Sequence, residues 1–373
     1  MAASRCDIMH LPGYSASSLN RPVCDSMRNL VFFVNDASWL EHNRVGIAGI
    51  NDPAVAGGSQ ANSSRQKAIA ELAGISAGDR IFFRLGRSAE HPTQIVGLFR
   101  ATSEPYFDPN PLFPGAQRVD HRLSLRVEFD CLRNYPNPVD IEHLWLSKER
   151  GSLWTIQQAR GDVIGRHACV SITTEEADLI IRLLEANNPV HAAPVDYVAQ
   201  RVALGISTIK KNNLPIDVTE SSRPRSPTPG RLHYEASLES ILMQELCGGL
   251  HRDLFGDFTE AIPFVSTGAQ TELDLLLSKY DGAKLLWHQV VELKAHTFSE
   301  DELRKVIDYE KWILNTRCEN ALQVHSVGIG YEFVDEVIHF VRNRKKYKDR
   351  PIRLIRYQFD AATHRLRLEA VEP

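Results

Sequence analysis

The spacing of hydrophobic and polar positions changes along the chain, and the change predicts two halves with different folds. From about residue 29 to 188 the apolar residues fall in short runs separated by turns and long polar loops, with helical spacing at 64–74 and 174–187. Short strands of this kind are typical of a small mixed β-barrel. The strand-like runs are NLVFFVND (29–36), RIFFRLG (80–86), TQIVGLFRATS (93–103) and LSLRVEFDCL (123–132).

The second half alternates helices with buried strands. YEASLESILMQELCGGL (234–250) has apolar residues at helical spacing and a glycine pair as its stop. TELDLLLSKYDGAKLLWHQVVELKAH (271–296) predicts two strands joined by a turn at Asp281-Gly282. A helix with Ser299 as its N-cap and a further buried strand at 324–333 follow. The predicted order is αβββαβ.

A shift in composition separates the two halves. Residues 189–230 end in TESSRPRSPTPG, whose prolines and serines disfavour helix and interior strand. We therefore predict an α+β chain with four segments. These are a loosely ordered arm at 1–28, a first domain at 29–188, a linker at 189–230 and a second domain at 231–373.

Composition narrows the classes of protein that fit. The 373 residues carry a formal net charge of -4, which disfavours nonspecific coating of nucleic acid but leaves room for a local basic groove. The six cysteines form no CxxC pair, so neither a disulfide framework nor a zinc finger is indicated. No apolar run has transmembrane length, and the first residues lack the apolar core of a secretion signal. We expect a cytoplasmic protein without a membrane partner.

The run VVELKAH (290–296) carries the strongest candidate chemistry. Glu292 and Lys294 stand two positions apart on a strand, so both point to one face, and burying two charges is costly unless they are paired or hold a ligand. A salt bridge at a strand end is one explanation. The other is a metal site, because the hairpin brings Asp274 close to 289–292. Asp274, Glu292 and the backbone carbonyl of Leu293 are ligands that suit Mg²⁺.

Lys294 would then orient or help deprotonate the attacking water. Desolvation between the strands would lower its pKa, which suits that role. Glu239, on the preceding helix, is an accessory acid, with Glu235 one turn earlier as the competitor for that position. His288 and His296 flank the strand; each could assist proton transfer or be an ordinary hydrogen-bonded histidine.

These residues carry a resemblance. TELDLLL and VVELKAH, with ASLESIL upstream and VIDYEKWI downstream, resemble the PD-(D/E)XK nuclease superfamily, particularly its RecB-like and archaeal mismatch-endonuclease branches, over roughly 232–345. The resemblance implies a restriction-endonuclease-like fold and cleavage of phosphodiester bonds with Mg²⁺, for which Mn²⁺ can substitute. It assigns catalysis to Glu239, Asp274, Glu292 and Lys294. The RecB-like branch has Gln four residues before the helical Tyr, whereas Lys305 precedes Tyr309 here.

The first half resembles PUA-like domains of the EVE and YTH type. The similarity lies in GDRIFFRLGRSAEHPTQIVGLFRATSEPYFD (78–108) and LWTIQQARGDVIGRHACVSIT (153–173). It implies a pocket in which a single base, often modified, is flipped out and stacked on aromatic side chains. The candidate base-binding residues, each of which could instead belong to the core or surface, are Asn35, Asp36, Ser38, Trp39, Trp145 and Trp154.

The two resemblances together predict a modification-dependent restriction endonuclease acting on double-stranded DNA. Arg84, Arg87, Lys345 and Lys346 are candidate contacts to the DNA backbone, or else solvated charges. A homodimer is expected, because one such site cuts one strand. The alternatives are a repair nuclease for mismatched or branched DNA, and a noncatalytic RNA- or DNA-base reader.

Overall fold

A computed structural model of the chain describes most of its residues. They are 27–53, 61–112, 123–146, 153–156, 167–190, 192–206, 212–218, 228–267, 271–347 and 351–372. The predicted arm at 1–28 lies almost entirely outside them. Among the described residues, no helix is both long and apolar enough to span a membrane.

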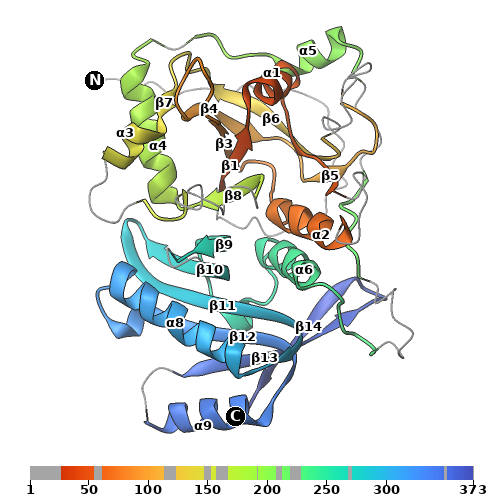
Figure 1. Ribbon diagram of the computed structural model, residues 1–373, viewed down its shortest axis with the longest axis vertical. Helices are drawn as coiled ribbons and strands as arrows, with labels where there is room; N and C mark the ends of the chain where they lie inside the picture. Colours follow the sequence, from red (N-terminus) through yellow and green to blue (C-terminus); the bar gives the residue numbers. More distant parts are fainter. Residues whose placement is uncertain are drawn as a thin grey trace, which may run out of the picture.

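The N-terminal half is built on a curled mixed sheet (Figure 1). The strands follow the order β2-β6-β4-β3-β1-β8, with β1 parallel to β3 and antiparallel to β8. Phe83 and Phe99 from β3 and β4 meet edge to face in the core. The bounds are β1 Asn29–Val34, β2 Ile47–Ile50, β3 Arg80–Leu85, β4 Gln94–Ala101, β5 Tyr106–Phe107, β6 Leu125–Arg133, β7 Val139–Asp140 and β8 Cys169–Ile172.

Five helices of the described residues surround this sheet: α1 Asp36–Val45, α2 Ala61–Leu72, α3 Ile141–Leu146, α4 Thr174–Asn187 and α5 Tyr197–Ala203. The predicted helical stretches at 64–74 and 174–187 correspond to α2 and α4. Thr173 caps α4 in a capping box with Glu176.

The predicted linker at 189–230 is in part a folded piece of the first domain. It contains α5, whose Tyr197 is 1% exposed and joins the core of the curled sheet. Residue 212 forms a bridge with Phe107 of β5. Burial of one aromatic ring therefore outweighs the linker-like composition. The Pro- and Ser-rich stretch 219–227 lies outside the described residues.

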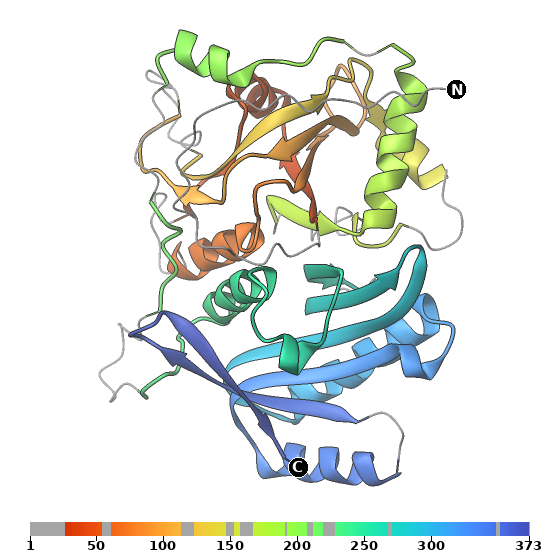
Figure 2. The ribbon, with the colours of Figure 1, turned by 180° about the vertical axis from the view of Figure 1, so that it is seen from behind.

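The C-terminal half contains a six-stranded sheet in the order β14-β13-β12-β11-β10-β9. Its elements follow the predicted αβββαβ order and then add α9, β13 and β14 (Figure 2). The Asp281-Gly282 hairpin forms as predicted, with Asp281 paired to Lys284. The bounds are α6 Glu235–Cys247, α7 Arg252–Phe255, β9 Glu260–Ser266, β10 Glu272–Asp281, β11 Lys284–Phe298, α8 Glu300–Arg317, β12 Val324–Phe333, α9 Asp335–Tyr347, β13 Ile352–Asp360 and β14 Arg365–Val371.

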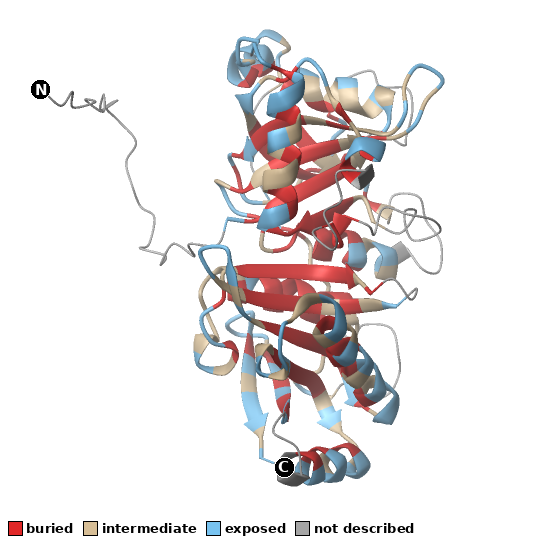
Figure 3. Cartoon of the chain, turned by 90° about the vertical axis from the view of Figure 1, so that its left-hand side faces the viewer, coloured by how far each residue is buried: buried red, intermediate tan, exposed pale blue. Residues whose placement is uncertain are grey.

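Two helices enclose the C-terminal sheet from opposite faces. Leu242 of α6 belongs to one cluster with Leu275 and Leu293, whereas Ile313 of α8 belongs to another with Leu276. Neighbouring strand residues point to opposite faces, so these two clusters mark the two sides of the sheet. Figure 3 shows the buried residues concentrated along the strands of both halves.

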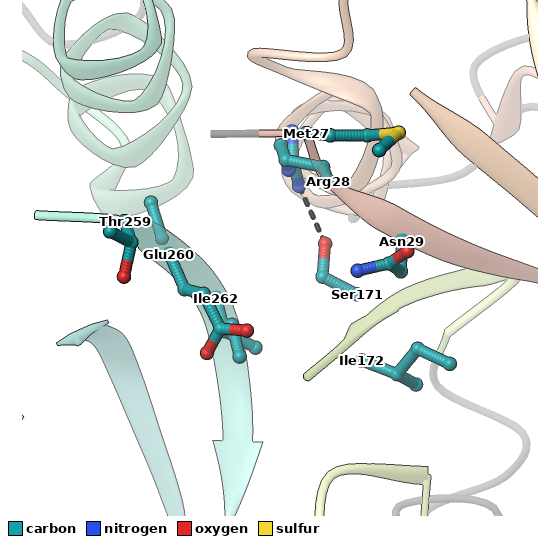
Figure 4. Close-up of a pocket in the computed structure, with 9 residues that line it drawn as sticks. Met27, Arg28, Asn29, Ser171, Ile172, Thr259, Glu260 and Ile262 are labelled. Atoms are coloured by element: carbon teal, nitrogen blue, oxygen red, sulfur yellow. Dashed lines mark hydrogen bonds between the residues drawn. The ribbon is translucent and has the colours of Figure 1, made fainter. Parts of the chain in front are cut away.

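The two halves pack on each other, with α2 lying beside α6 (Figure 1). Gln66 of α2 accepts hydrogen bonds from the Ser237 hydroxyl of α6 and from the Asp217 N–H. A small cavity of about 10 Å³ lies farther along the seam, between Arg28, Ser171 and Glu260 (Figure 4). That volume is about one water molecule, so the seam is close-packed.

Candidate functional site

The β10–β11 hairpin brings Asp274 and Glu292 together. Leu275 pairs with Val291 across the hairpin. Asp274 precedes Leu275 and Glu292 follows Val291, so the two carboxylates lie next to each other on the sheet face that α8 covers. Asp274 Oδ2 accepts a hydrogen bond of 2.6 Å from the Leu293 N–H. Burial raises the pKa of Asp274 well above its usual range, and the Glu292 carboxylate raises it further.

The backbone of Leu293 contacts Asp274 directly. The contact is made through the Leu293 N–H, so one Asp274 oxygen already has a donor. The metal-binding role predicted for the Leu293 carbonyl stays a prediction.

Glu292 is the most enclosed acid of the site, with 2% of the residue exposed. Its Oε1 lies 3.2 Å from Nζ of Lys305 on α8, while Oε2 is buried without a hydrogen-bond partner in the described residues. Burial raises the pKa of Glu292 to about 7, although the Lys305 ammonium opposes the rise. A buried carboxylate oxygen that lacks a donor is suited to a cation.

Lys294 points to two other acids. Its Nζ lies 2.9 Å from Glu235 Oε2 at the start of α6 and 3.6 Å from Glu302 Oε1 at the start of α8. Burial alone would lower the pKa of Lys294, but the Glu235 carboxylate outweighs it and raises the pKa. In this arrangement Lys294 is a charged hydrogen-bond donor, and the lowered pKa expected beside a metal ion stays a prediction.

Glu239 reaches the site from α6. It is 4% exposed, and its Oε1 is buried with no hydrogen-bond partner in the described residues. Burial raises the pKa of Glu239 well above its usual range, and the nearby Asp274 carboxylate adds to the rise. Glu235, the competing acid, is bound to Lys294 instead. The accessory role of Glu239 stays a prediction.

Asp274, Glu292 and Glu239 meet only part of the requirements of a divalent-cation site. Within the described residues, no three His, Cys, Asp or Glu side chains are close enough to form a metal cluster. Mg²⁺, however, is commonly held by one or two carboxylates together with waters and substrate phosphate. Asp274 and Glu292 supply such a pair, and the partnerless oxygens of Glu292 and Glu239 would gain a partner from a cation.

The two flanking histidines differ in exposure. His288 is 2% exposed, and its Nδ1 is 2.8 Å from the Ser278 hydroxyl. Burial lowers the pKa of His288 to about 4, which suits a neutral structural residue. His296 is exposed on β11.

The N-terminal half contains an aromatic pocket of about 230 Å³. A cavity needs about 10–15 Å³ to hold one water, so this pocket has room for a planar ring. It opens between α1, β4 and the start of α5. Its walls are Trp39, Asn43, Val96, Gly97, Phe99, Cys131, Arg133, Asn134, Tyr135, Pro136, Pro138, Val195 and Tyr197.

Trp39 is the predicted base-binding residue that lines this pocket. Its ring lies 6.0 Å from that of Phe99, centroid to centroid. Asn35 and Ser38 instead form a reciprocal capping box at the start of α1, and Asp36 pairs with His91 at 2.7 Å. These three polar side chains serve the helix and an ion pair, and they are not among the pocket walls.

Trp154 lies elsewhere. It is 5% exposed and packs at the seam between the halves, 5.8 Å from the Trp312 ring, with the Arg317 guanidinium 4.5 Å from its own ring. Both contacts come from α8 of the second half, so this ring is part of the seam and is not open to a base. Trp145 belongs to α3, and its side chain lies outside the described residues.

The candidate backbone contacts are dispersed. Arg84 is partly buried, with its guanidinium 5.3 Å from the Phe33 ring, and burial lowers its pKa. Arg87 is exposed beyond the end of β3. Lys345 and Lys346 belong to α9, and their side chains lie outside the described residues. The DNA contact of all four stays a prediction.

The sequence reasoning missed two members of the carboxylate site. Glu302 closes the capping box with Ser299, so its local pattern indicates a cap, yet its other oxygen faces Lys294. Lys305 was noted as a departure from a motif and was not predicted to contact Glu292. Both lie on the first turns of α8, and their spacing of three residues places them on one helix face.

Comparison with known proteins identifies part of the N-terminal half. The family described as EVE domain matches residues 56–183, so this part of the chain is an EVE domain of PUA-like fold. The match lies within the predicted first domain. No curated protein sequence matches the chain.

Several solved structures are similar to about half of the chain or less. A hypothetical protein from Leishmania major is 11% identical, covering 44% of this chain and 98% of its own, with a TM-score of 0.31. Human THYN1 protein, solved in complex with DNA containing 5-methylcytosine, is 15% identical, covering 42% and 98%, with a TM-score of 0.27. The YTH domain of Toxoplasma CPSF4 is 15% identical, covering 52% and 91%, with a TM-score of 0.22.

Proposed function

We propose that the chain is a modification-dependent restriction endonuclease. The EVE domain takes up a modified base of double-stranded DNA, and the carboxylate site of the C-terminal half hydrolyses phosphodiester bonds with Mg²⁺ or Mn²⁺. The observation that carries the proposal is the pairing of Asp274 and Glu292 across the β10–β11 hairpin, with Lys294 two residues farther along β11, in a chain that also contains an EVE domain.

The reader half of the proposal rests on the EVE match and on the aromatic pocket. Trp39 and Phe99 offer ring faces on which a base can stack, and polar side chains such as Asn43 and Asn134 lie on the same walls. Removing a base from the duplex costs a few kcal/mol, which stacking and hydrogen bonds in such a pocket can return. The bound base is thereby separated from its neighbours before the backbone is cut.

In the cutting half, each side chain has a distinct role. Mg²⁺ bound at Asp274 and Glu292 would supply charge stabilisation at the phosphate and an activated water. Lys294, held by Glu235 and Glu302, donates a hydrogen bond that orients the attacking water. As an ammonium, it also stabilises the negative charge that develops at the phosphate.

The testing experiment is cleavage of matched duplexes containing cytosine, methylcytosine, hydroxymethylcytosine or glucosylated cytosine, with Mg²⁺ or Mn²⁺. We expect cutting of one modified duplex. Lys294→Ala and Glu292→Ala should lower the cutting rate at least 100-fold, since one preorganised group of this kind is worth a factor of about 10²–10³. Both variants should bind the modified duplex as the wild type does.

Lys311→Ala is the matched control, because Lys311 is an exposed lysine on α8 that pairs with Asp308. Normal cutting by Lys294→Ala would refute the site assignment. Cutting of every duplex alike would leave the nuclease and remove the base reader, whereas cutting of mismatched or branched DNA alone would indicate a repair nuclease. Binding of a base without any cutting would indicate a noncatalytic reader. The proposal also includes a homodimer, because double-strand cleavage needs two such sites.

A further inference from the structure

We infer that Lys305 competes with a divalent cation for Glu292 and, once displaced, contacts a phosphate of bound DNA. The inference rests on the proposed function and deepens it. It assigns to α8 a second lysine of the cutting site, in addition to Lys294 on β11.

The first support is the partner pattern of the two lysines. Lys294 Nζ lies 2.9 Å from Glu235 Oε2 and 3.6 Å from Glu302 Oε1. Lys305 Nζ lies 3.2 Å from Glu292 Oε1. The lysine that neutralises the buried carboxylate is thus the one on α8, not its neighbour on the same strand.

The second support is the contrast in exposure. The Glu292 side chain is 2% exposed, whereas that of Lys305 is 46% exposed. Lys305 therefore extends from solvent to the edge of an enclosed acid, with its stem on the helix surface. It can leave Glu292 for solvent or for a DNA phosphate without carrying a buried charge through the core.

The helix beneath Lys305 is fixed, so the movement would be confined to the side chain. Val306 is fully buried, and the hydroxyl of Tyr309 donates a hydrogen bond of 2.6 Å to the Glu272 carbonyl on β10. One turn of α8 is thereby tied to the strand that carries Asp274. The lysine head remains the adjustable part of the site.

Lys305 and a divalent cation would exclude each other from Glu292, because their positive charges repel. A buried carboxylate without a partner is destabilising, so Lys305 stabilises Glu292 when no metal is bound. A divalent cation at the same carboxylate repels the ammonium, which then has a strong alternative partner only where a phosphate is present. Metal binding and DNA binding would therefore favour each other through this one side chain.

The test compares Lys305→Met with Lys311→Met, which removes an exposed lysine six residues farther along the same helix. Mg²⁺ is titrated against the full chain without DNA, with the thermal shift as readout. We expect Lys305→Met to bind Mg²⁺ at least threefold more tightly than the wild type, because the competing ammonium is gone. Lys311→Met should match the wild type. Unchanged or weaker Mg²⁺ binding by Lys305→Met would overturn the inference.

The DNA arm uses Ca²⁺ in place of Mg²⁺, so that binding is measured without cutting. Lys305→Met should bind the duplex at least fivefold more weakly, with a smaller dependence on salt concentration, and Lys305→Arg should restore most of the affinity. Normal DNA binding by Lys305→Met would refute the phosphate contact. A wild type that binds Mg²⁺ but cuts no DNA would refute the proposed function, while the Mg²⁺ titration would still decide the role of Lys305.

Discussion

At the scale of single residues, Glu292 links the site to stability. Burial raises its pKa from an ordinary 4.5 to about 7, against the opposing effect of Lys305. Between those two pH values the folded chain holds a proton that the unfolded chain has released. Stability contributed by this group is therefore present below pH 4.5 and is lost as the pH rises through about 7.

Glu292→Gln should remove that loss. Without added metal, we expect the variant to gain on the order of 2 kcal/mol relative to wild type between pH 5 and pH 8, because a shift of one pKa unit is worth about 1.4 kcal/mol. Chemical unfolding at both pH values measures the difference. Glu332→Gln, an exposed glutamate on β12, serves as the control. Parallel stability curves for wild type and Glu292→Gln would show that Glu292 is ionised in both states.

The sequence predicts the strand face on which Glu292 lies, but not the side chains that it contacts. Alternation along VVELKAH correctly predicts that Glu292 and Lys294 share a face with Asp274, because a hairpin fixes register over a few residues. Which lysine meets which acid depends on how α6 and α8 approach the strand. That approach is set by packing far along the chain, so neither the Lys305–Glu292 pair nor the Lys294–Glu235 pair followed from local pattern.

At the scale of elements, α2 packs closely against α6, the helix that carries Glu239. Gly74 follows α2 with φ of +77°, and a Cβ built there would lie 2.9 Å from Cys247 Sγ and 3.1 Å from the Met243 carbonyl. Both neighbours belong to α6, which also carries Glu239. The glycine thus permits a positive φ and a close helix approach at once.

Gly74→Ala should therefore cost more than Gly205→Ala. Gly205 also follows a helix, with φ of +64°, but nothing lies within 4 Å of its Cβ position. A left-handed alanine costs about 1–2 kcal/mol at either place. Overpacking adds about 1–3 kcal/mol at Gly74 alone. Urea unfolding of both variants measures the difference, and equal losses would show that α6 is not pressed against this position.

Local elements were predictable where their signals are local. The N-cap at Ser299 and the Asp281-Gly282 turn are read from a few adjacent residues and occur as expected. The helix α5 was missed because its main stabilisation is burial of Tyr197 in a core formed by residues far earlier in the chain. Trp154 was misplaced for the same reason, since its partners lie on α8.

At the scale of the whole molecule, His167 connects the two halves. Its Nδ1 lies 3.1 Å from Glu71 Oε1 on α2, and its Nε2 lies 2.8 Å from Glu272 Oε2 on β10, two residues before Asp274. Burial alone would lower the pKa of His167, but the bonds to Glu272 and Glu71 raise it to about 9. Burial raises the pKa of Glu71, which the histidine opposes. The protonated ring thus bridges a carboxylate of the N-terminal half and the strand that carries Asp274.

The pH dependence of this bridge has a definite sign. A raised histidine pKa contributes stability that is complete below pH 6.5 and is lost as the pH rises through about 9. His167→Gln should therefore be less stable than wild type at pH 7, by on the order of 2 kcal/mol, and should approach it near pH 10. The variant should also separate the unfolding of the two halves into two calorimetric transitions at pH 7, because the charged contact between them is gone.

His91→Gln is the matched control, since His91 pairs with Asp36 inside the N-terminal half and does not touch the seam. It should leave the number of transitions unchanged. A difference between His167→Gln and wild type that stays constant from pH 7 to pH 10 would mean that His167 is neutral and acts by packing alone. A difference that closes as the pH rises would establish a charged link between Glu71 of the EVE domain and Glu272 on the strand of Asp274.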